Sequence, residues 1–199
     1  MLNGGPTLAL GWRDGKFLPA RWNHYCELMM LYLLAIGSPS HPIDAAAWRA
    51  FSRPHIQYAG LDYISGDDPL FVHQYSHAWF DFRHQRDQYA DYFVNSVLAT
   101  RAHKAFCLSL GKPYTDDYWG ISASDSAHGY TGWGGPSARG QGFGGIDGSV
   151  VPCAAAGSLP FAPAACLRVL RALKARYPRA YGRYGFCDAF HPEAGWYDP

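Results

Sequence analysis

The stretch that decides the fold is RWNHYCELMMLYLLAIGSPSHP, residues 21–42. From Tyr25 to Ile36 the run is almost wholly apolar, and Glu27 is its single acidic side chain. A helix that is apolar on every side is a buried helix. The run is shorter than the roughly 20 apolar residues that cross a bilayer. It therefore predicts the core helix of a globular domain, opened by Asn23 as N-cap and stopped at Gly37, and no membrane partner.

Glu27 has two interpretations within such a helix. A buried carboxylate is costly unless it is paired or protonated, and desolvation raises its pKa, as a general acid needs. Alternatively, Glu27 lies in the first turn, where it is exposed and complements the helix dipole. Both interpretations stay open on the sequence alone.

Five strings of this sequence together resemble one family, the glycoamylase-like domain found in enzymes that act on β-1,2-glucans and related sugars. The first is W-N-x-Y-x-E at residues 22–27, followed by L-A-I-G-S-P-x-H-P at 34–42. The others are HQYSHAWFDFR (73–83), the W-G-x-x-A-S-D and G-Y-x-x-W-G-G-P strings (119–136), the DG and VVPCAAAGSLPFAP segment (147–163), and YGFCDAF (184–190). The family often has an acidic residue where this chain has His24.

The resemblance implies an (α/α)6 barrel around a sugar-binding cleft. The helices expected here are too few for twelve, so the prediction is an all-α chain, a partial (α/α)6 barrel with long aromatic and Gly-rich loops. Residues 1–199 are expected to form a single glycoamylase-like domain, incomplete and equivalent to the later portion of the family's domain. Exposed barrel helices would then favour association with a partner. No cofactor is expected.

Composition narrows the class of protein. The 199 residues are 48% hydrophobic and 17% charged, which indicates an ordered globular domain. A net charge of +1 without a run of Lys or Arg argues against nucleic acid as a partner. The five cysteines lack C-x-x-C spacing, so buried free thiols are expected rather than a zinc site or a disulfide framework. No signal peptide is predicted, which as written implies the cytoplasm, whereas the resemblance implies a periplasmic or secreted protein.

Residues 114–160 are rich in glycine and aromatic residues and lack a helical period. Loops of this length are usually functional or disordered, and the aromatic content favours a binding loop. Aromatic rings stack on sugar rings, although ordinary core packing explains most individual rings equally well. Gly140, Gly142, Gly144 and Gly145 are expected to form a hinge or lid, not a dinucleotide site.

The segment PLFVHQYSHAWFDFRHQRD, residues 69–87, has aromatic side chains near helical spacing. His73 and His77 would share one helical face, but no acidic third ligand accompanies them, so no metal site is predicted. Asp81 and Arg83 form either a structural ion pair or a grip on sugar hydroxyls.

Three further helices are expected. One begins near Asp44 and ends at Pro54. The second spans residues 89–110 and serves as scaffold. The third opens at Pro163, where the missing N–H costs nothing, and buries a stripe that includes Cys166, Val169 and Leu173.

These features predict a glycoside hydrolase or transglycosylase acting on β-linked glucans, β-1,2-glucan among them, with Glu27 as general acid. Glycosidases pair the acid with a second carboxylate. Asp125 is the first choice and Asp81 the second. The side chains expected to bind substrate are Trp22, Tyr75, His77, Arg83, Trp119, His128, Tyr130 and Trp133. The alternatives are a non-catalytic carbohydrate-binding or assembly module derived from a truncated barrel, and a purely structural helical domain.

Overall fold

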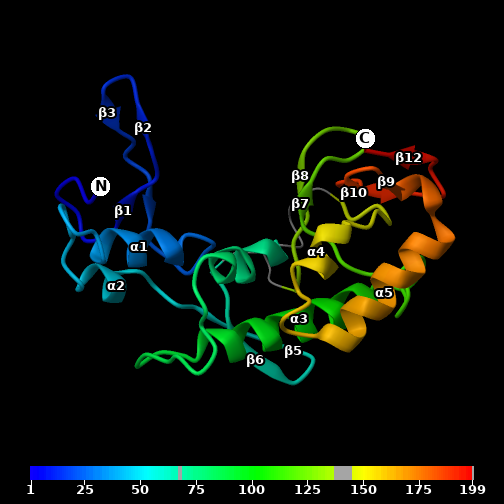
Figure 1. Ribbon diagram of the computed structural model, residues 1–199, viewed down its shortest axis with the longest axis horizontal. Coiled ribbons are helices and arrows are strands. Elements are labelled where there is room, and N and C mark those ends of the chain that lie inside the picture. The colour runs from blue at the N-terminus through cyan, green and yellow to red at the C-terminus, as the bar shows by residue number, and fades with distance from the viewer. Residues whose placement is uncertain (67–68, 137–144, 199) are drawn as a thin grey trace.

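The computed structural model describes residues 1–66, 69–136 and 145–198, and the fold is reported for these residues. Helices α1 (Met29–Ile36) and α2 (Ala47–Ala50) lie at the N-terminal end of an elongated molecule (Figure 1). Helix α5 (Pro163–Arg176) and the C-terminal strands lie at the other end, and α3 (Tyr92–Ser109) runs between them. A short helix, α4 (Pro152–Ala156), precedes α5.

The strands form six antiparallel pairs, each of only two strands. The pairs are β1 (Leu8–Ala9) with β4 (Arg21–Trp22), β2 (Trp12–Arg13) with β3 (Lys16–Phe17), β5 (His55–Tyr58) with β6 (Leu61–Ile64), β7 (Ala123–Ser124) with β8 (Thr131–Gly132), β9 (Tyr181–Gly182) with β10 (Gly185–Phe186), and β11 (Phe190–His191) with β12 (Trp196–Tyr197). The prediction of an all-α, partial (α/α)6 barrel is therefore wrong, because these pairs alternate with only five α-helices in the described ranges. The prediction considered only helices, and it did not anticipate that short segments between them form β-hairpins.

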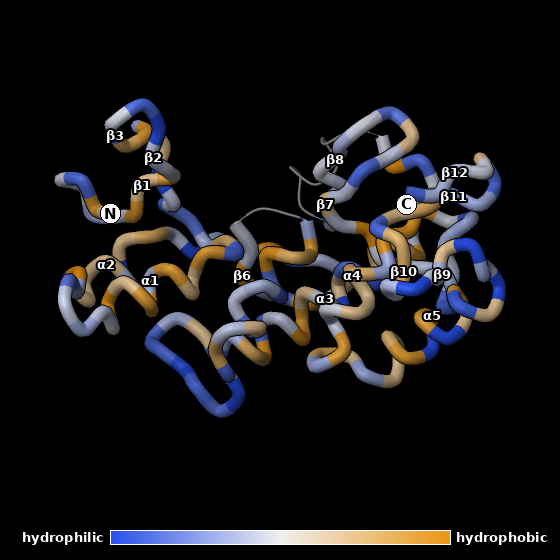
Figure 2. Tube along the Cα trace, turned by 45° about the horizontal axis from the view of Figure 1, so that its top comes forward, coloured by the Kyte–Doolittle hydropathy of each residue, from blue (hydrophilic) through white to orange (hydrophobic). Residues whose placement is uncertain are grey.

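Helix α1 is shorter than its apolar run. It begins at Met29 with Leu28 as N-cap, not at Asn23, and Gly37 ends it by donating its N–H to the Leu33 carbonyl at 2.9 Å. Glu27 consequently lies in the turn before the helix rather than inside it. Although α1 is hydrophobic over most of its length (Figure 2), it is not buried on every side. Leu34 is 53% exposed, so that expectation was only partly correct.

Helices α3 and α5 match their predictions closely. Asp91 caps α3, its carboxylate accepting the Val94 N–H at 3.0 Å. Pro163 is the first residue of α5, and the predicted stripe Cys166, Val169 and Leu173 is buried. Both helices have local start signals, an Asx cap and an N1 proline, which explains why their bounds could be read from the sequence.

Two segments with apolar helical spacing do not form long helices. The helix predicted from Asp44 to Pro54 is reduced to the four residues of α2, and the β5–β6 hairpin follows. Ala59 and Gly60 both have positive φ in the turn of this hairpin. Alanine rarely adopts this conformation, so its presence did not indicate a turn. Residues 69–87 contain two 3₁₀ turns, η1 (Leu70–His73) and η2 (Tyr75–Ala78), and no α-helix. A third 3₁₀ turn, η4 (Pro178–Ala180), follows α5.

Two main clusters of buried side chains organise the molecule. The N-terminal cluster is built around Tyr25, Met29 and Tyr32. The C-terminal cluster includes Trp119, Trp133 and the small residues of α4. Gln74 lies between η1 and η2. Its side-chain amide donates to the Ala154 carbonyl at 2.8 Å and to Ser158 Oγ at 2.7 Å. These bonds tie η1 and η2 to α4.

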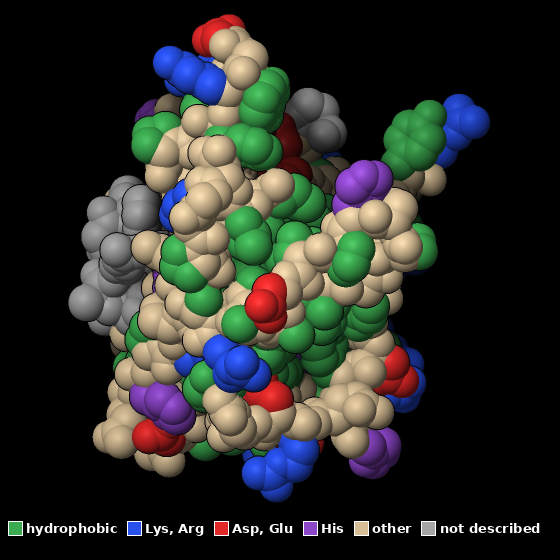
Figure 3. Space-filling model, turned by 90° about the vertical axis from the view of Figure 1, so that its left-hand side faces the viewer, with side chains coloured by type: hydrophobic (Ala, Val, Ile, Leu, Met, Phe, Trp, Pro, Cys, Tyr) green, Lys and Arg blue, Asp and Glu red, His purple; other side chains and the backbone are tan. Residues whose placement is uncertain are grey.

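The N-terminal end carries exposed hydrophobic side chains. Leu10, Trp12 and Leu34 are all exposed there, and Figure 3 shows hydrophobic side chains gathered across the middle of this face. The predicted association through exposed helices stays a prediction. Within the described ranges, no helix combines the length and the apolar character that a membrane crossing requires.

Candidate functional site

The turn that carries Glu27 opens onto a cavity of about 230 Å³. Glu27 is half-buried there. Ser76 of η2 fixes the turn, because its hydroxyl donates to the Glu27 carbonyl at 2.6 Å and accepts the Met30 N–H at 3.2 Å. The backbone on both sides of the start of α1 is thus held by a single side chain from a distant segment.

Aromatic side chains from three segments form much of the wall around Glu27. Trp22 comes from β4, Phe71 from η1, and Tyr130 from the residue preceding β8. The Trp22 indole N–H donates to the Leu10 carbonyl at 3.4 Å, which orients its ring. Tyr130 is 74% exposed, so its ring is accessible at the mouth of the cavity. A carboxyl group beside flat rings in a mostly apolar cavity suits both proton donation and sugar stacking.

A second cavity, of about 390 Å³, contains another group of the predicted residues. His77, Asp81 and Arg83 line it together with Trp79 and Phe161. Arg83 donates to both carboxylate oxygens of Asp81, from Nε to Oδ1 at 2.9 Å and from Nη2 to Oδ2 at 2.7 Å. These bonds from Arg83 lower the pKa of Asp81 to about 2. Asp81 is therefore ionised at neutral pH and can accept hydroxyl protons but not donate one.

His77 is neutral at the edge of this cavity. Burial lowers its pKa to about 4. The Ser96 hydroxyl donates to the His73 carbonyl at 2.8 Å, so its oxygen accepts the proton of His77 Nε2, 2.9 Å away. The imidazole packs edge-on against Phe82 and Phe161, with centroid distances of 4.9 and 4.8 Å. These contacts make His77 part of the wall rather than a free base.

Asp125 and His128 are not among the residues that line either cavity. Asp125 is exposed, and its N–H donates to Asp188 Oδ2 at 3.2 Å. Burial raises the pKa of Asp198, and the negative charges of Asp125 and Asp188 raise it further. His128 is exposed in the turn between β7 and β8. The structure therefore does not bring the first-choice partner, Asp125, into the described wall of the Glu27 cavity.

The two tryptophans predicted to stack on sugar are buried. Trp119 is 0% and Trp133 2% exposed, and both belong to the C-terminal cluster of the core. Neither ring offers an open face in this structure, because core side chains surround it. Tyr75, by contrast, is exposed on η2 but lines neither cavity.

Sequence reasoning did not anticipate Phe71, Trp79 or Phe161 as cavity residues. Phe71 and Trp79 belong to the segment whose aromatic side chains are near helical spacing, yet they line different cavities. The predicted glycine hinge falls almost entirely within residues 137–144, which lie outside the described residues, as do residues 67 and 68 of the turn before η1. In the described part of the chain, no three His, Cys, Asp or Glu side chains are grouped to hold a metal ion.

Comparison with known families gives one match, the glycoamylase family described as "Putative glucoamylase", over residues 19–199. Among curated proteins, the chain is similar to the exo-β-1,2-glucooligosaccharide sophorohydrolase (non-reducing end) of Parabacteroides distasonis. The two are 26% identical over 208 residues, which cover 89% of this chain and 28% of that protein.

Solved structures show the same likeness. The endo-β-1,2-glucanase of Chitinophaga pinensis, in complex with sophorotriose and glucose, matches with a TM-score of 0.83 and 25% identity, over 99% of this chain and 50% of that one. The "putative glucoamylase" of Bacteroides uniformis matches with a TM-score of 0.87 and 27% identity, over 98% of this chain and 50% of that one. The chain thus spans about half the length of these structures and less of the curated relative.

Proposed function

The chain belongs to the glycoamylase family, and from that premise we propose that it is a glycoside hydrolase acting on β-linked glucans, with Glu27 as the proton donor. The observation that carries the proposal is the cavity in which half-buried Glu27 lies beside Trp22 and Tyr130. Two relatives are named for hydrolysis of β-1,2-linked glucose chains, which makes β-1,2-glucan the substrate to test first.

In this proposal, the Glu27 carboxyl group protonates the glycosidic oxygen as the bond to the leaving sugar breaks. Trp22 and Tyr130 stack on the flanking sugar rings, since their side chains border the same cavity. Glu27 is the only carboxyl group among the described residues that line this cavity. Its partner carboxylate is therefore to be identified by mutation, with Asp125 and Asp81 as the two candidates.

Asp81 suits a binding role better than a proton-donating role. Its pairing with Arg83 keeps it ionised, and the pair stays exposed at the second cavity, where it can accept and donate hydrogen bonds to sugar hydroxyls. Asp81→Asn should therefore raise KM more than it lowers kcat. If Asp81 were the partner carboxylate, kcat would fall by orders of magnitude instead.

The test is release of reducing ends from β-1,2-glucan by the protein and its Glu27→Gln variant. Glutamine keeps the shape of the side chain but cannot give a proton, so cleavage should fall by about 100-fold or more. The matched control is Glu193→Gln, which changes the only other glutamate of the chain at an exposed turn and should leave the rate unchanged.

Calorimetric titration with β-1,2-glucooligosaccharides separates the proposal from a non-catalytic sugar-binding module. Binding without cleavage by the unchanged protein would favour the module. Full cleavage by Glu27→Gln would refute the role assigned to Glu27.

A further inference from the structure

Helix α1 begins without a cap from its own segment. Its N-cap is Leu28, whose side chain has no hydrogen-bonding atom, and the Met30 N–H is among the first four that find no acceptor inside a helix. Ser76 of η2, 46 residues away along the chain, supplies the acceptor, because its hydroxyl oxygen accepts the Met30 N–H at 3.2 Å. An N-cap serine usually makes this bond within its own helix.

The same hydroxyl group also donates to the Glu27 carbonyl, at 2.6 Å. A serine hydroxyl has one proton to give and an oxygen that accepts, so Ser76 uses both functions at once. The Glu27 peptide and the first turn of α1 are therefore joined through one atom, Ser76 Oγ. The Glu27 side chain is half-buried in the wall of its cavity, and its direction depends on where this peptide is held.

Ser76 is itself held firmly. It is buried, and its carbonyl accepts the Phe80 N–H at 3.1 Å. Gln74, which directly precedes η2, is anchored by the bond from its side-chain amide to the Ala154 carbonyl. Ser76 is not among the residues that line the Glu27 cavity, so its effect on a substrate there must pass through the turn that it holds.

The other end of the turn is fixed by different contacts. The Tyr25 N–H donates to the Ser52 carbonyl at 2.7 Å, and the Tyr25 side chain is fully buried. Gly66 packs so closely on the Tyr25 carbonyl that an added methyl group would overlap it. With Tyr25 fixed on one side, Ser76 fixes the turn on the side of Glu27.

We propose that Ser76 is a positioning residue for the glucan hydrolysis proposed above, an inference that rests on Glu27 being the proton donor. Its hydroxyl group holds the Glu27 carboxyl group at the place where the glycosidic oxygen receives the proton. Without this hydroxyl, the Glu27 carbonyl and the Met30 N–H lose their partner, and the turn can shift. A displacement of about 1 Å in a reacting group can lower the rate about 100-fold.

The experiment measures kcat and KM for β-1,2-glucan in Ser76→Ala. We expect kcat to fall by about 10- to 100-fold and KM to change by less than about twofold, because the side chains that border the cavity are unchanged. Ser76→Cys repeats the test with the space of the hydroxyl filled, and its kcat should also fall, since a thiol donates only weakly. Unchanged kcat in either variant would overturn the proposal.

A double variant shows whether Ser76 acts through Glu27. In the Glu27→Gln background no proton donor is left to position, so adding Ser76→Ala should lower the residual rate by less than about twofold. Losses that multiply in the double variant would overturn the proposal, because Ser76 would then act on another part of the reaction or on the fold.

Thr100→Val is the matched control for the loss of a buried hydroxyl group. The Thr100 hydroxyl donates to Ser158 Oγ at 3.3 Å, and Thr100 does not line the Glu27 cavity. Its kcat should be unchanged whatever the shift in Tm. An equal fall of kcat in this control would overturn the proposal, since loss of stability would then explain both results.

The positioning role and the proposed function can fail separately. Full cleavage by Glu27→Gln would refute the proton donor. Reduced cleavage by Glu27→Gln together with full cleavage by Ser76→Ala would refute only the role of Ser76.

Discussion

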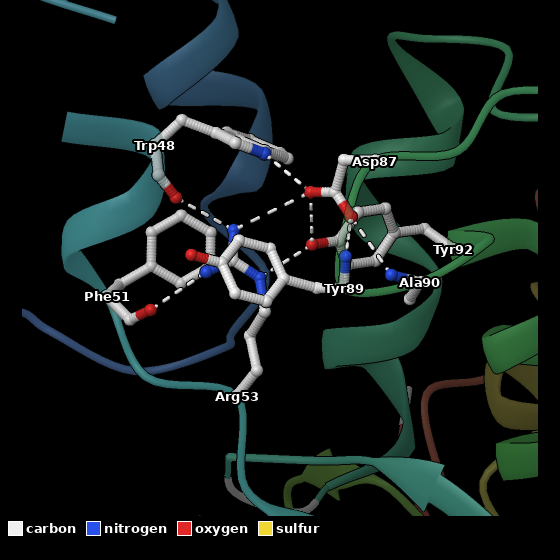
Figure 4. Close-up of polar contacts among 7 residues, drawn as sticks. All are labelled: Trp48, Phe51, Arg53, Asp87, Tyr89, Ala90 and Tyr92. Atoms are coloured by element: carbon white, nitrogen blue, oxygen red, sulfur yellow. Dashed lines mark hydrogen bonds and ion pairs between the residues drawn. The ribbon is translucent and has the colours of Figure 1, made fainter. Parts of the chain in front are cut away.

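Replacement of Arg53 by methionine should strongly destabilise the protein, because its charged side chain is buried and bonded to three acceptors. Figure 4 shows the Arg53 guanidinium enclosed by Trp48, Phe51, Tyr89 and Tyr92. Its side chain is 4% exposed. Nε donates to the Tyr92 hydroxyl at 2.6 Å, Nη1 to the Phe51 carbonyl at 2.9 Å, and Nη2 to the Trp48 carbonyl at 2.8 Å. The charge also lies 3.8 Å from the centroid of the Phe51 ring.

Asp87 is the acidic neighbour of this guanidinium, but the ionised state of Asp87 does not depend on Arg53 alone. The nearest oxygen of Asp87 is 3.9 Å from Arg53 Nη2. Burial raises the pKa of Asp87, yet hydrogen bonds from the backbone of Ala90 and Tyr89 and from the side chains of Trp48 and Tyr92 outweigh this effect and lower it. Asp87 therefore keeps its charge without Arg53. The larger part of the cost should come from the three acceptors that lose their donor.

The magnitude follows from these contacts. Each buried acceptor left without a donor costs about 1–3 kcal/mol, and three acceptors lose their donor in this variant. Because these losses overlap, we expect a loss of about 3–5 kcal/mol in the free energy of unfolding. For a chain of this length, about 2–4 °C is lost per kcal/mol, so Tm should fall by roughly 6–20 °C.

The assay is thermal and urea unfolding followed by circular dichroism. Arg49→Met, at an exposed position of α2, is the matched control and should shift Tm by less than about 2 °C. Arg53→Lys should recover only part of the loss, since an ammonium cannot reach three acceptors in a fixed fork. A Tm shift in Arg53→Met no larger than that of the control would refute the reasoning.

Three further predictions concern stability and the Glu27 turn. Burial lowers the pKa of His73 to about 3 and the pKa of His103 to about 4, and it is the largest cause of each shift. Their stabilising effect is complete above the unfolded-state pKa of about 6.5 and is lost as pH falls toward 4, at about 1.4 kcal/mol per pH unit for each histidine. The urea midpoint should therefore drop between pH 7 and pH 5, and an unchanged midpoint would contradict this. Asp91→Ala removes the cap of α3 and should cost about 1 kcal/mol in urea unfolding, whereas Asp91→Asn should cost less. In Gly66→Ala the new methyl group would overlap the Tyr25 carbonyl oxygen, so the turn before Glu27 must shift. We expect a loss of glucan cleavage with this variant, and retained cleavage would show that the turn tolerates the displacement.

The sequence by itself determined the features that depend on neighbouring residues. Asp91 and Pro163 marked the starts of α3 and α5, because a cap and an N1 proline act within one turn of helix. The ordered strings of the glycoamylase family predicted the membership that the comparison over residues 19–199 confirmed.

Tertiary structure alone decided which surfaces the apolar side chains cover. Apolar spacing fixes that a residue such as Trp119 avoids water, but not whether a core or a sugar-binding cavity surrounds it. It also could not show that Glu27 precedes its helix, or that Arg83 holds Asp81 ionised. These outcomes depend on packing between segments far apart in the chain, such as Ser76 against the Glu27 carbonyl. A pattern of neighbouring residues does not predict which distant segments come into contact.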